Sequence, residues 1–164
     1  MRYAQIRKYD VANGSGIRVS LFVSGCTLGC KNCFNKAYQD FAFGKELDES
    51  AIELLTEYLS CDTIKGLSVL GGEPMDNARE LGDIIYKIRQ KVDKGIWIYS
   101  GYTLEQILKD EWKKKLLMLC DVLVDGRFVE ELKDLRLRFR GSSNQRIIDI
   151  QESIRHDKVV LWME

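Results

Sequence analysis

Three cysteines lie within one short stretch of the sequence, VSGCTLGCKNCFNKAY (residues 23–38). Cys26, Cys30 and Cys33 follow the pattern C-x3-C-x2-C. Thiolates at such close spacing are typical ligands of zinc ions and of iron–sulfur clusters. Three thiolates are one fewer than a closed structural metal site needs. The identity of the fourth ligand therefore decides what this stretch does.

Three interpretations of the cysteines remain open at this point. A structural zinc ion needs a fourth donor, for which His156, Cys61 and Cys120 are the spare candidates; a small buried side chain is the simpler interpretation of both spare cysteines. A ferredoxin-type electron carrier needs a fourth cysteine, and its usual spacings differ from this one. The third interpretation is a four-iron cluster held by three cysteines, whose remaining iron binds a substrate and passes an electron to it.

Polar or glycine-rich loops follow three further apolar segments. GGEP (71–74) follows GLSVL, SGY (100–102) follows GIWIY, and DGR (125–127) follows DVLV. In parallel α/β sheets the carboxyl ends of the strands share one edge, where ligands bind. We therefore expect these loops and the cysteine loop to face one common site, although each loop alone is also compatible with an ordinary turn.

Short β-rich segments alternate with segments of helical periodicity along the chain. Strands are predicted at residues 17–23, 66–70, 95–99, 121–124, 146–150 and 158–162, and helices at 49–60, 77–92 and 104–119. The face of the first helix that is expected to be buried consists of Ala51, Leu54, Leu55 and Tyr58. Asp76 is expected to cap the second helix, and Thr103 and Gln106 to form a capping box on the third.

Strands that alternate with amphipathic helices predict right-handed βαβ crossovers. The expected fold class is therefore α/β: a parallel sheet built from successive βα units, either as an open sheet or as an incomplete barrel. At 164 residues, the chain is expected to form one domain, residues 1–164. Trp97, Tyr99, Tyr102 and Trp112 need no role beyond packing.

The charge balance and the cysteine content restrict the class of protein. The chain has 25 basic and 25 acidic side chains, which argues against a nucleic-acid or membrane-surface partner, since both attract a basic excess. The amino-terminal stretch lacks the apolar core of a secretion signal, and no run is long enough to span a membrane. We expect a cytoplasmic protein, in which clustered cysteines stay reduced and bind metal or act in catalysis.

The combined motifs resemble those of a known superfamily. C-x3-C-x2-C followed by GGEP is similar to the radical S-adenosylmethionine superfamily, and GSGIR ahead of the cysteines resembles its glycyl-radical activating enzymes. DVLVDGRF and FRGSSNQRIIDI (139–150) resemble specifically the activating proteins of anaerobic ribonucleoside-triphosphate reductase. The resemblance covers nearly the whole chain.

The resemblance implies a cofactor, a reaction and partners. Cys26, Cys30 and Cys33 would hold a [4Fe-4S] cluster whose open iron binds S-adenosyl-L-methionine. Reductive cleavage would give a 5′-deoxyadenosyl radical, which takes a hydrogen atom from a glycine of the large catalytic subunit of the reductase. A flavodoxin or ferredoxin would supply the electron, and the implied fold is an incomplete barrel.

The same resemblance suggests which residues contact S-adenosylmethionine. Gly71, Gly72 and Glu73 would face its amino group, and Ser100 and Gly101 its ribose. Asn32 and Phe34 are the candidates for the adenine. Asp125 and Arg127 match a pair placed near the carboxylate. No catalytic side chain is expected beyond these, and an activase of a formate-lyase-type enzyme or a non-catalytic iron–sulfur or zinc protein are the alternatives.

Overall fold

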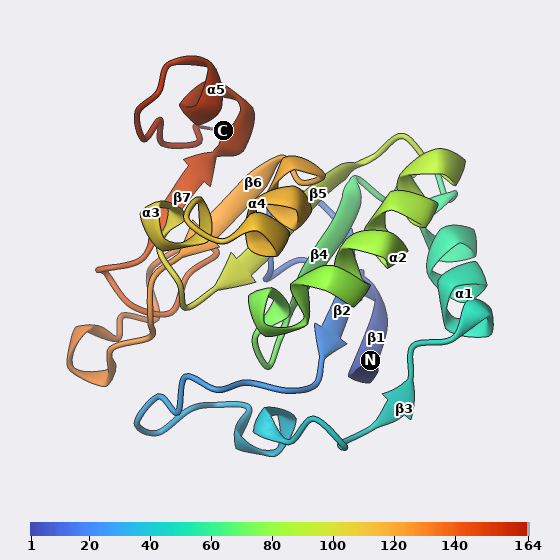
Figure 1. Cartoon of the computed structure of the whole chain (residues 1–164), viewed down its shortest axis with the longest axis horizontal. Coiled ribbons are helices and arrows are strands. Elements are labelled where there is room, and N and C mark those ends of the chain that lie inside the picture. Colours follow the sequence, from blue (N-terminus) through green and yellow to red (C-terminus); the bar gives the residue numbers. More distant parts are fainter. Residues whose placement is uncertain (164) are drawn as a thin grey trace.

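The computed structural model describes residues 1–163, and in this part of the chain seven strands form one sheet (Figure 1). The strand order is β3-β1-β2-β4-β5-β6-β7. The strands are β1 (Arg2–Asp10), β2 (Arg18–Val23), β3 (Lys45–Glu46), β4 (Gly66–Gly71), β5 (Gly95–Ser100), β6 (Val122–Asp125) and β7 (Arg146–Asp149). The two outermost strands, β3 and β7, are not paired with each other, so the sheet is open.

The four central strands, β2, β4, β5 and β6, run parallel to one another. The outer strands β1, β3 and β7 are antiparallel to their neighbours. The predicted parallel sheet is therefore confirmed at the centre and corrected at both edges. β1, which the sequence analysis left unassigned, joins β2 through the short connection 11–17. Such a connection is too short for the crossover that parallel strands require.

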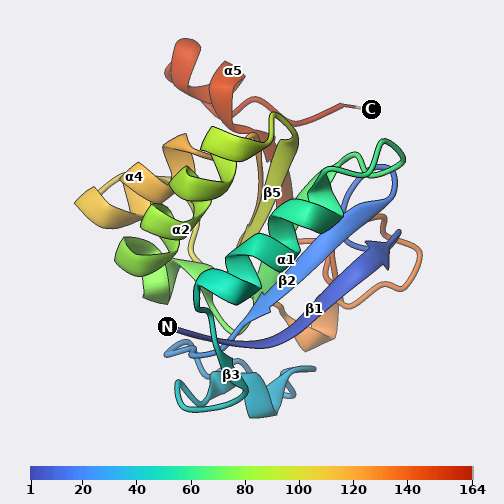
Figure 2. The same ribbon diagram turned by 90° about the vertical axis from the view of Figure 1, so that its right-hand side faces the viewer.

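Helices cover one face of this sheet. The helices are α1 (Glu49–Leu59), α2 (Ala78–Lys91), α3 (Leu104–Ile107), α4 (Glu111–Met118) and α5 (Ile150–Arg155), with short 3-10 helices η1 (Lys36–Gln39), η2 (Pro74–Asn77) and η3 (Glu130–Leu132). In Figures 1 and 2, α1, α2 and α4 lie side by side on the same face. Central strand residues such as Leu21, Val69 and Ile98 are fully buried in the resulting core. Within residues 1–163, no helix is long and apolar enough to cross a membrane.

Two helix predictions need correction. The buried face of α1 includes Ile52 and Leu59, whereas Leu54 and Tyr58 are only half-buried. The helix predicted over 104–119 is divided into α3 and α4. The Asp110 side chain accepts a hydrogen bond from the Lys113 main chain, which begins a new helix at that point. The capping box of Thr103 and Gln106 is confirmed.

Two further assignments also differ from expectation. Asp76 does not cap α2. Its carboxylate instead accepts hydrogen bonds from the Thr27 main chain (2.7 Å) and the Tyr102 hydroxyl (2.8 Å). The segment 158–162 makes one isolated bridge, Ile148 with Leu161, rather than a strand. In both places a tertiary contact has replaced the local structure that the sequence favours.

A buried arginine joins three of the parallel strands near their amino ends. Arg18 on β2 is 3% exposed. Its Nε donates to the Ser68 hydroxyl (2.7 Å), and one terminal nitrogen donates to the carbonyls of Leu67 (2.9 Å) and Gly95 (2.8 Å). Burial lowers the pKa of Arg18 to about 10, which leaves it charged at neutral pH.

Arg18→Met tests this junction. The variant removes the guanidinium while keeping an unbranched side chain, so the buried carbonyls lose a charged donor. We expect the free energy of unfolding to fall by about 2–4 kcal/mol in urea titrations. The control Lys91→Met alters an exposed lysine of α2 and should change it by less than about 0.5 kcal/mol. Equal effects of the two substitutions would contradict this role of Arg18.

Candidate functional site

The four predicted loops do meet at one edge of the sheet. Because β2, β4, β5 and β6 are adjacent and parallel, their carboxyl ends lie together. The cysteine loop follows β2, GGEP follows β4, SGY follows β5 and DGR follows β6. In Figure 1 the cysteine loop and the connection 126–145 both lie at this lower edge.

A cavity of about 590 Å³ opens among these loops. Nine of the twelve predicted site residues line it: Cys26, Cys30, Cys33, Phe34, Gly71, Gly72, Glu73, Ser100 and Gly101. Asn32, Asp125 and Arg127 do not belong to its lining. The structure therefore brings together the cysteines and the loops that follow β4 and β5, while DGR contributes only Gly126.

The cysteine loop is tied to the rest of the chain on both sides. Gly25 donates its N–H to the Tyr38 carbonyl (2.8 Å), and Cys26 donates to Gln39 (3.1 Å). Cys33 donates to the Cys30 carbonyl (3.3 Å), which forms a turn within the loop. All three thiols are half-buried and free of disulfides. Burial raises the pKa of the Cys26 thiol, and the nearby carboxylates of Glu73 and Asp76 add to this.

The three thiols are compatible with the ligand arrangement of a four-iron cluster. Within residues 1–163, no three His, Cys, Asp or Glu side chains converge closely enough to hold one metal ion. Each cysteine of a four-iron cluster binds a different iron, so its ligands do not have to meet at one point. A short loop with three free thiols on the wall of a cavity satisfies that requirement.

Glu73 is buried at 1% exposure and connects two of the loops. Its carboxylate accepts hydrogen bonds from the Met75 main chain (2.9 Å), the Ser100 hydroxyl (2.8 Å) and the Gly101 main chain (2.8 Å). Burial raises its pKa to about 7, against the ordinary value of 4.5, while these three donors oppose the shift. A titratable carboxyl group therefore lies on the cavity wall, poised to change charge near neutral pH.

The GGEP glycines are required by the chain's own packing. Gly71 has a φ of +114°, a conformation that side chains disfavour. A Cβ on Gly72 would lie 2.5 Å from the Gly25 carbonyl oxygen and 2.7 Å from that of Tyr38. Glu73 also donates its N–H to the Gly25 carbonyl (2.7 Å). These contacts hold GGEP directly against the cysteine loop.

Asn32 and Phe34 lie differently with respect to the cavity. Asn32, with a φ of +52°, directs its amide to the Glu130 carboxylate (2.7 Å). Phe34 lines the cavity and is 67% exposed at its rim, with its ring centroid 5.1 Å from that of Phe128. Of the two adenine candidates, Phe34 is therefore the one whose side chain faces the cavity.

Asp125 supports the site from behind the cavity wall. It is 1% exposed, and its carboxylate accepts hydrogen bonds from Leu104 N–H (2.8 Å) and Arg146 Nε (2.9 Å). Arg146 also pairs with Glu105, and its hydrogen bond lowers the pKa of Glu105 to about 2. Arg127 is exposed, outside the lining. In this structure Asp125 joins β6, β7 and α3, and its oxygens are already engaged.

Gln145 lines the cavity, and the sequence analysis did not single it out. Its side-chain oxygen accepts from the main chains of Gly141 (2.8 Å) and Ser142 (3.1 Å), and its nitrogen donates to the Gly126 carbonyl (2.9 Å). It thereby folds FRGSSNQRIIDI into a rim of the cavity. The available signal was this polar segment itself, which the sequence analysis used only for the family resemblance. Tyr99, expected only to pack, lines the cavity as well.

Comparison with known proteins agrees with this site. Residues 12–148 match a family model described as a 4Fe-4S single cluster domain. The class to which this match assigns the chain is that of proteins with a 4Fe-4S single cluster domain.

Individual relatives are more specific. The chain is 37% identical over 150 residues to the anaerobic ribonucleoside-triphosphate reductase-activating protein of Pasteurella multocida, covering 88% of this chain and 95% of the relative. The protein of that name from Escherichia coli is 36% identical, over 88% of this chain and 96% of its own. The one from enterobacteria phage T4 is 32% identical over 96% and 100%. The chain belongs to the family of anaerobic ribonucleoside-triphosphate reductase-activating proteins.

Gly72→Ala tests the contact between GGEP and the cysteine loop. The new methyl group has to displace main-chain atoms of Gly25 or Tyr38. We therefore expect the free energy of unfolding to fall by about 1–3 kcal/mol. Iron uptake by the displaced cysteines should fall as well. Gly82→Ala on α2 meets nothing within 4 Å and should stabilise the helix by about 0.5–1 kcal/mol. Chemical denaturation and iron analysis of both variants provide the comparison, and a neutral Gly72→Ala would contradict the packing described.

Glu73→Gln tests the buried carboxyl group through pH. The folded state holds this proton more tightly than the unfolded chain. The stability gained from this bound proton is therefore complete below pH 4.5, and it is lost as the pH rises through about 7. Relative to the non-titrating variant, the wild type should lose about 3 kcal/mol between pH 4 and pH 8. Urea titrations across this range measure the difference, and a constant difference would show that Glu73 titrates normally.

Proposed function

We propose that the chain activates anaerobic ribonucleoside-triphosphate reductase by reductive cleavage of S-adenosylmethionine. The observation that carries the proposal is the single cavity that the three cysteines share with the loops after β4 and β5. The relatives' names supply the partner, which is the large catalytic subunit of the reductase. In this proposal the open sheet is an incomplete barrel of the radical S-adenosylmethionine type, and the chain is one cytoplasmic domain.

Cys26, Cys30 and Cys33 would hold the [4Fe-4S] cluster. When bound, that cluster would supply one electron, received from a flavodoxin or ferredoxin, for the reductive cleavage of S-adenosylmethionine into methionine and a 5′-deoxyadenosyl radical. That radical would take a hydrogen atom from a reductase glycine. The protein's own contribution is to bind, orient and shield the reactants. The half-buried thiols and the enclosing loops serve that purpose.

Glu73 would balance the positive charge of the S-adenosylmethionine amino group. A carboxyl group with a pKa near 7 ionises readily when a cation enters beside it. Gly71 and Gly72 leave main-chain groups accessible on the same wall, and Ser100 and Gly101 would face the ribose. The exposed Phe34 ring would stack on the adenine. Asn32, Asp125 and Arg127 stay predictions as ligand contacts.

Anaerobic reconstitution tests the proposal. With iron and sulfide, the wild type should develop the broad visible absorption of a four-iron cluster. Once reduced, it should release 5′-deoxyadenosine from S-adenosylmethionine. Mixing it with the reductase large subunit should produce a glycyl-radical doublet in electron paramagnetic resonance. Cys30→Ala should abolish all three signals, whereas Cys61→Ala, which alters a cysteine outside the cavity lining, should retain them.

Other outcomes point to the alternatives. A colourless protein that binds one zinc ion tightly would refute the proposal. A stable cluster without cleavage of S-adenosylmethionine would indicate a non-catalytic iron–sulfur protein. Cleavage without a doublet on this reductase would indicate a different glycyl-radical partner, such as a formate-lyase-type enzyme.

A further inference from the structure

The Asp76 carboxylate joins the cysteine loop to the two loops beside it. One of its oxygens accepts hydrogen bonds from the Thr27 main chain (2.7 Å) and the Thr27 hydroxyl (2.9 Å). The other oxygen accepts from the Tyr102 hydroxyl (2.8 Å). Thr27 directly follows Cys26, the first proposed cluster ligand, and Tyr102 belongs to the SGY loop. Three donors from two other loops therefore hold this carboxylate next to the first cysteine.

Asp76 has no part in the proposed binding of S-adenosylmethionine. It is half-buried in η2, directly after GGEP. Neither Asp76 nor its partners Thr27 and Tyr102 belong to the cavity lining. Any effect of this side chain on the reaction has to act through the loops that it joins or through its charge.

The charge of Asp76 reaches the sulfur of Cys26. Burial is the main cause that raises the pKa of the Cys26 thiol, and the charges of Glu73 and Asp76 raise it further. Main-chain hydrogen bonds from Leu28 and Gly29 act in the opposite direction. In the proposed complex the amino group of S-adenosylmethionine balances Glu73. The donors on Asp76 are neutral groups, which orient its carboxylate without cancelling its charge.

Lys113 on α4 does not cancel that charge either. Its ammonium group lies over the Tyr102 ring, 4.9 Å from the centroid, and pairs with Asp110 (3.3 Å). In the part of the chain that the structure describes, no basic side chain forms an ion pair with Asp76. A carboxylate that is fixed in place and not paired with a cation therefore lies beside the cysteine loop.

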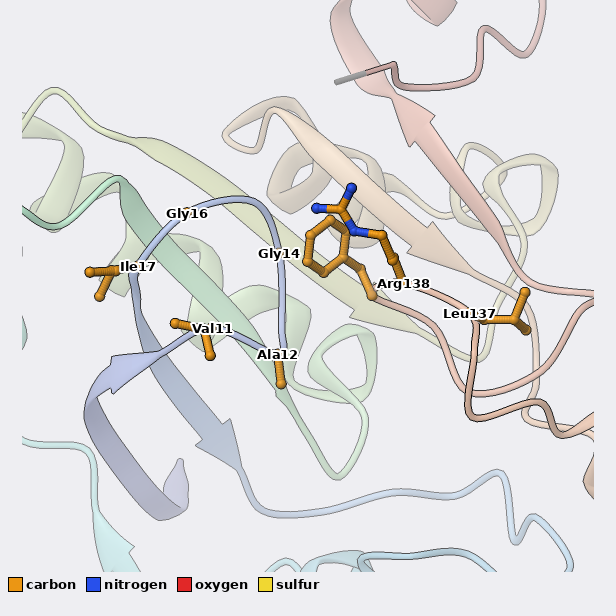
Figure 3. A pocket seen from close by; sticks show the side chains of 8 residues that line it. Val11, Ala12, Gly14, Gly16, Ile17, Leu137 and Arg138 are labelled. Carbon is orange, nitrogen blue, oxygen red and sulfur yellow. The ribbon is translucent and has the colours of Figure 1, made fainter.

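A second hollow of the molecule offers no comparable charge. A shallow groove of about 520 Å³ lies between the β1–β2 connection and residues 137–139 (Figure 3). Of the eight residues that line it, Arg138 alone is charged, and none is a cysteine. The search for a group that acts on the cysteines from outside the cavity therefore leads to Asp76.

We propose that the Asp76 carboxylate, held beside Cys26 by Thr27 and Tyr102, keeps the cluster strongly reducing. The inference rests on the proposed function, in which an electron has to pass to a sulfonium that accepts it reluctantly. One-electron reduction adds a negative charge to a cluster, and a fixed carboxylate nearby opposes that charge. Without the charge of Asp76, the cluster would be easier to reduce and would be a weaker reductant.

Asp76→Asn removes the charge and is able to keep the three contacts. Its amide oxygen can accept from both Thr27 groups, and its amide nitrogen can donate to the Tyr102 hydroxyl oxygen. The test is a redox titration of the reconstituted protein without S-adenosylmethionine, followed by electron paramagnetic resonance. At a given potential, the ratio of reduced to oxidised cluster should rise about 3- to 10-fold, a positive shift of about 30–60 mV. Asp83→Asn, at an exposed carboxylate of α2, should cause no shift.

The same variant should separate reduction from cleavage. With the cluster fully reduced, release of 5′-deoxyadenosine per reduced cluster should fall by up to the same factor, because the driving force is smaller. Iron content and affinity for S-adenosylmethionine should stay unchanged, since Asp76 lies outside the cavity lining. A role in loop folding alone would lower the iron content and would not raise the reduced fraction.

Two further variants provide an independent test. Asp76→Glu keeps the charge, so its potential should lie closer to the wild type than that of Asp76→Asn. Tyr102→Phe also keeps the charge but removes one of the three donors that hold it, so a smaller positive shift is expected. Tyr86→Phe, at a tyrosine of α2 that is 55% exposed, should cause no shift. If Asp76→Asn fails to bind iron, an unchanged potential in Tyr102→Phe would overturn the inference.

The outcomes separate the inference from the proposed function. A wild type that does not cleave S-adenosylmethionine would refute the proposed function and the inference with it. An active wild type whose potential is unchanged or lowered in Asp76→Asn would overturn the inference alone. An equal shift in Asp83→Asn would overturn it as well, because the effect would then follow the net charge of the protein rather than the position of Asp76.

Discussion

The Glu73 side chain connects the loops that follow β4 and β5, and its main-chain N–H donates to Gly25 at the start of the cysteine loop. Three strand ends are thereby joined at one residue. The arrangement is costly, since burial raises the pKa of the carboxyl group to about 7. Three hydrogen-bond donors offset part of that cost. A strained electrostatic position of this kind is typical of a site that gains stability when its ligand binds.

The connection between β6 and β7 provides the other half of the site. It contains only one short 3-10 helix, η3, and is organised by side chains such as Gln145. Its base is held by Asp125, Arg146 and Glu105, which join β6, β7 and α3. Because these polar groups are engaged with one another, the surface that this connection presents to the cavity comes from Gly126, Phe128, Gly141 and their neighbours.

Much of the site could be predicted from the sequence because it is formed by the loops that directly follow the central strands. Cysteine spacing and the loop after each central strand require only that the strands be parallel and adjacent. The position of Phe34 beside Cys33 follows from the sequence in the same way. By contrast, Asp125 and Arg127 share a loop with Gly126, but one side chain is buried against Arg146 and the other is exposed. Sequence spacing alone does not indicate that difference.

The edges of the sheet were less predictable. β1 carries many charged residues and is only half-buried, so its periodicity is weak. It becomes a strand because β2 offers an antiparallel neighbour. The break between α3 and α4 likewise depends on Asp110 capping a second helix rather than continuing the first. Where the local sequence only weakly favours a helix or a strand, such contacts decide which structure forms.

The sequence by itself determined the spacing of the cysteines, the central βα units and the loops that meet at their carboxyl ends, because spacing and periodicity are local properties. Only the tertiary structure decided which side chains reach the cavity. It turned Asp125 toward Arg146 and pressed Gly72 against Gly25. Among the residues that the structure describes, it left the buried Tyr99 hydroxyl without a hydrogen-bond partner. These outcomes depend on residues far apart in the chain, whose distances are set when the core packs.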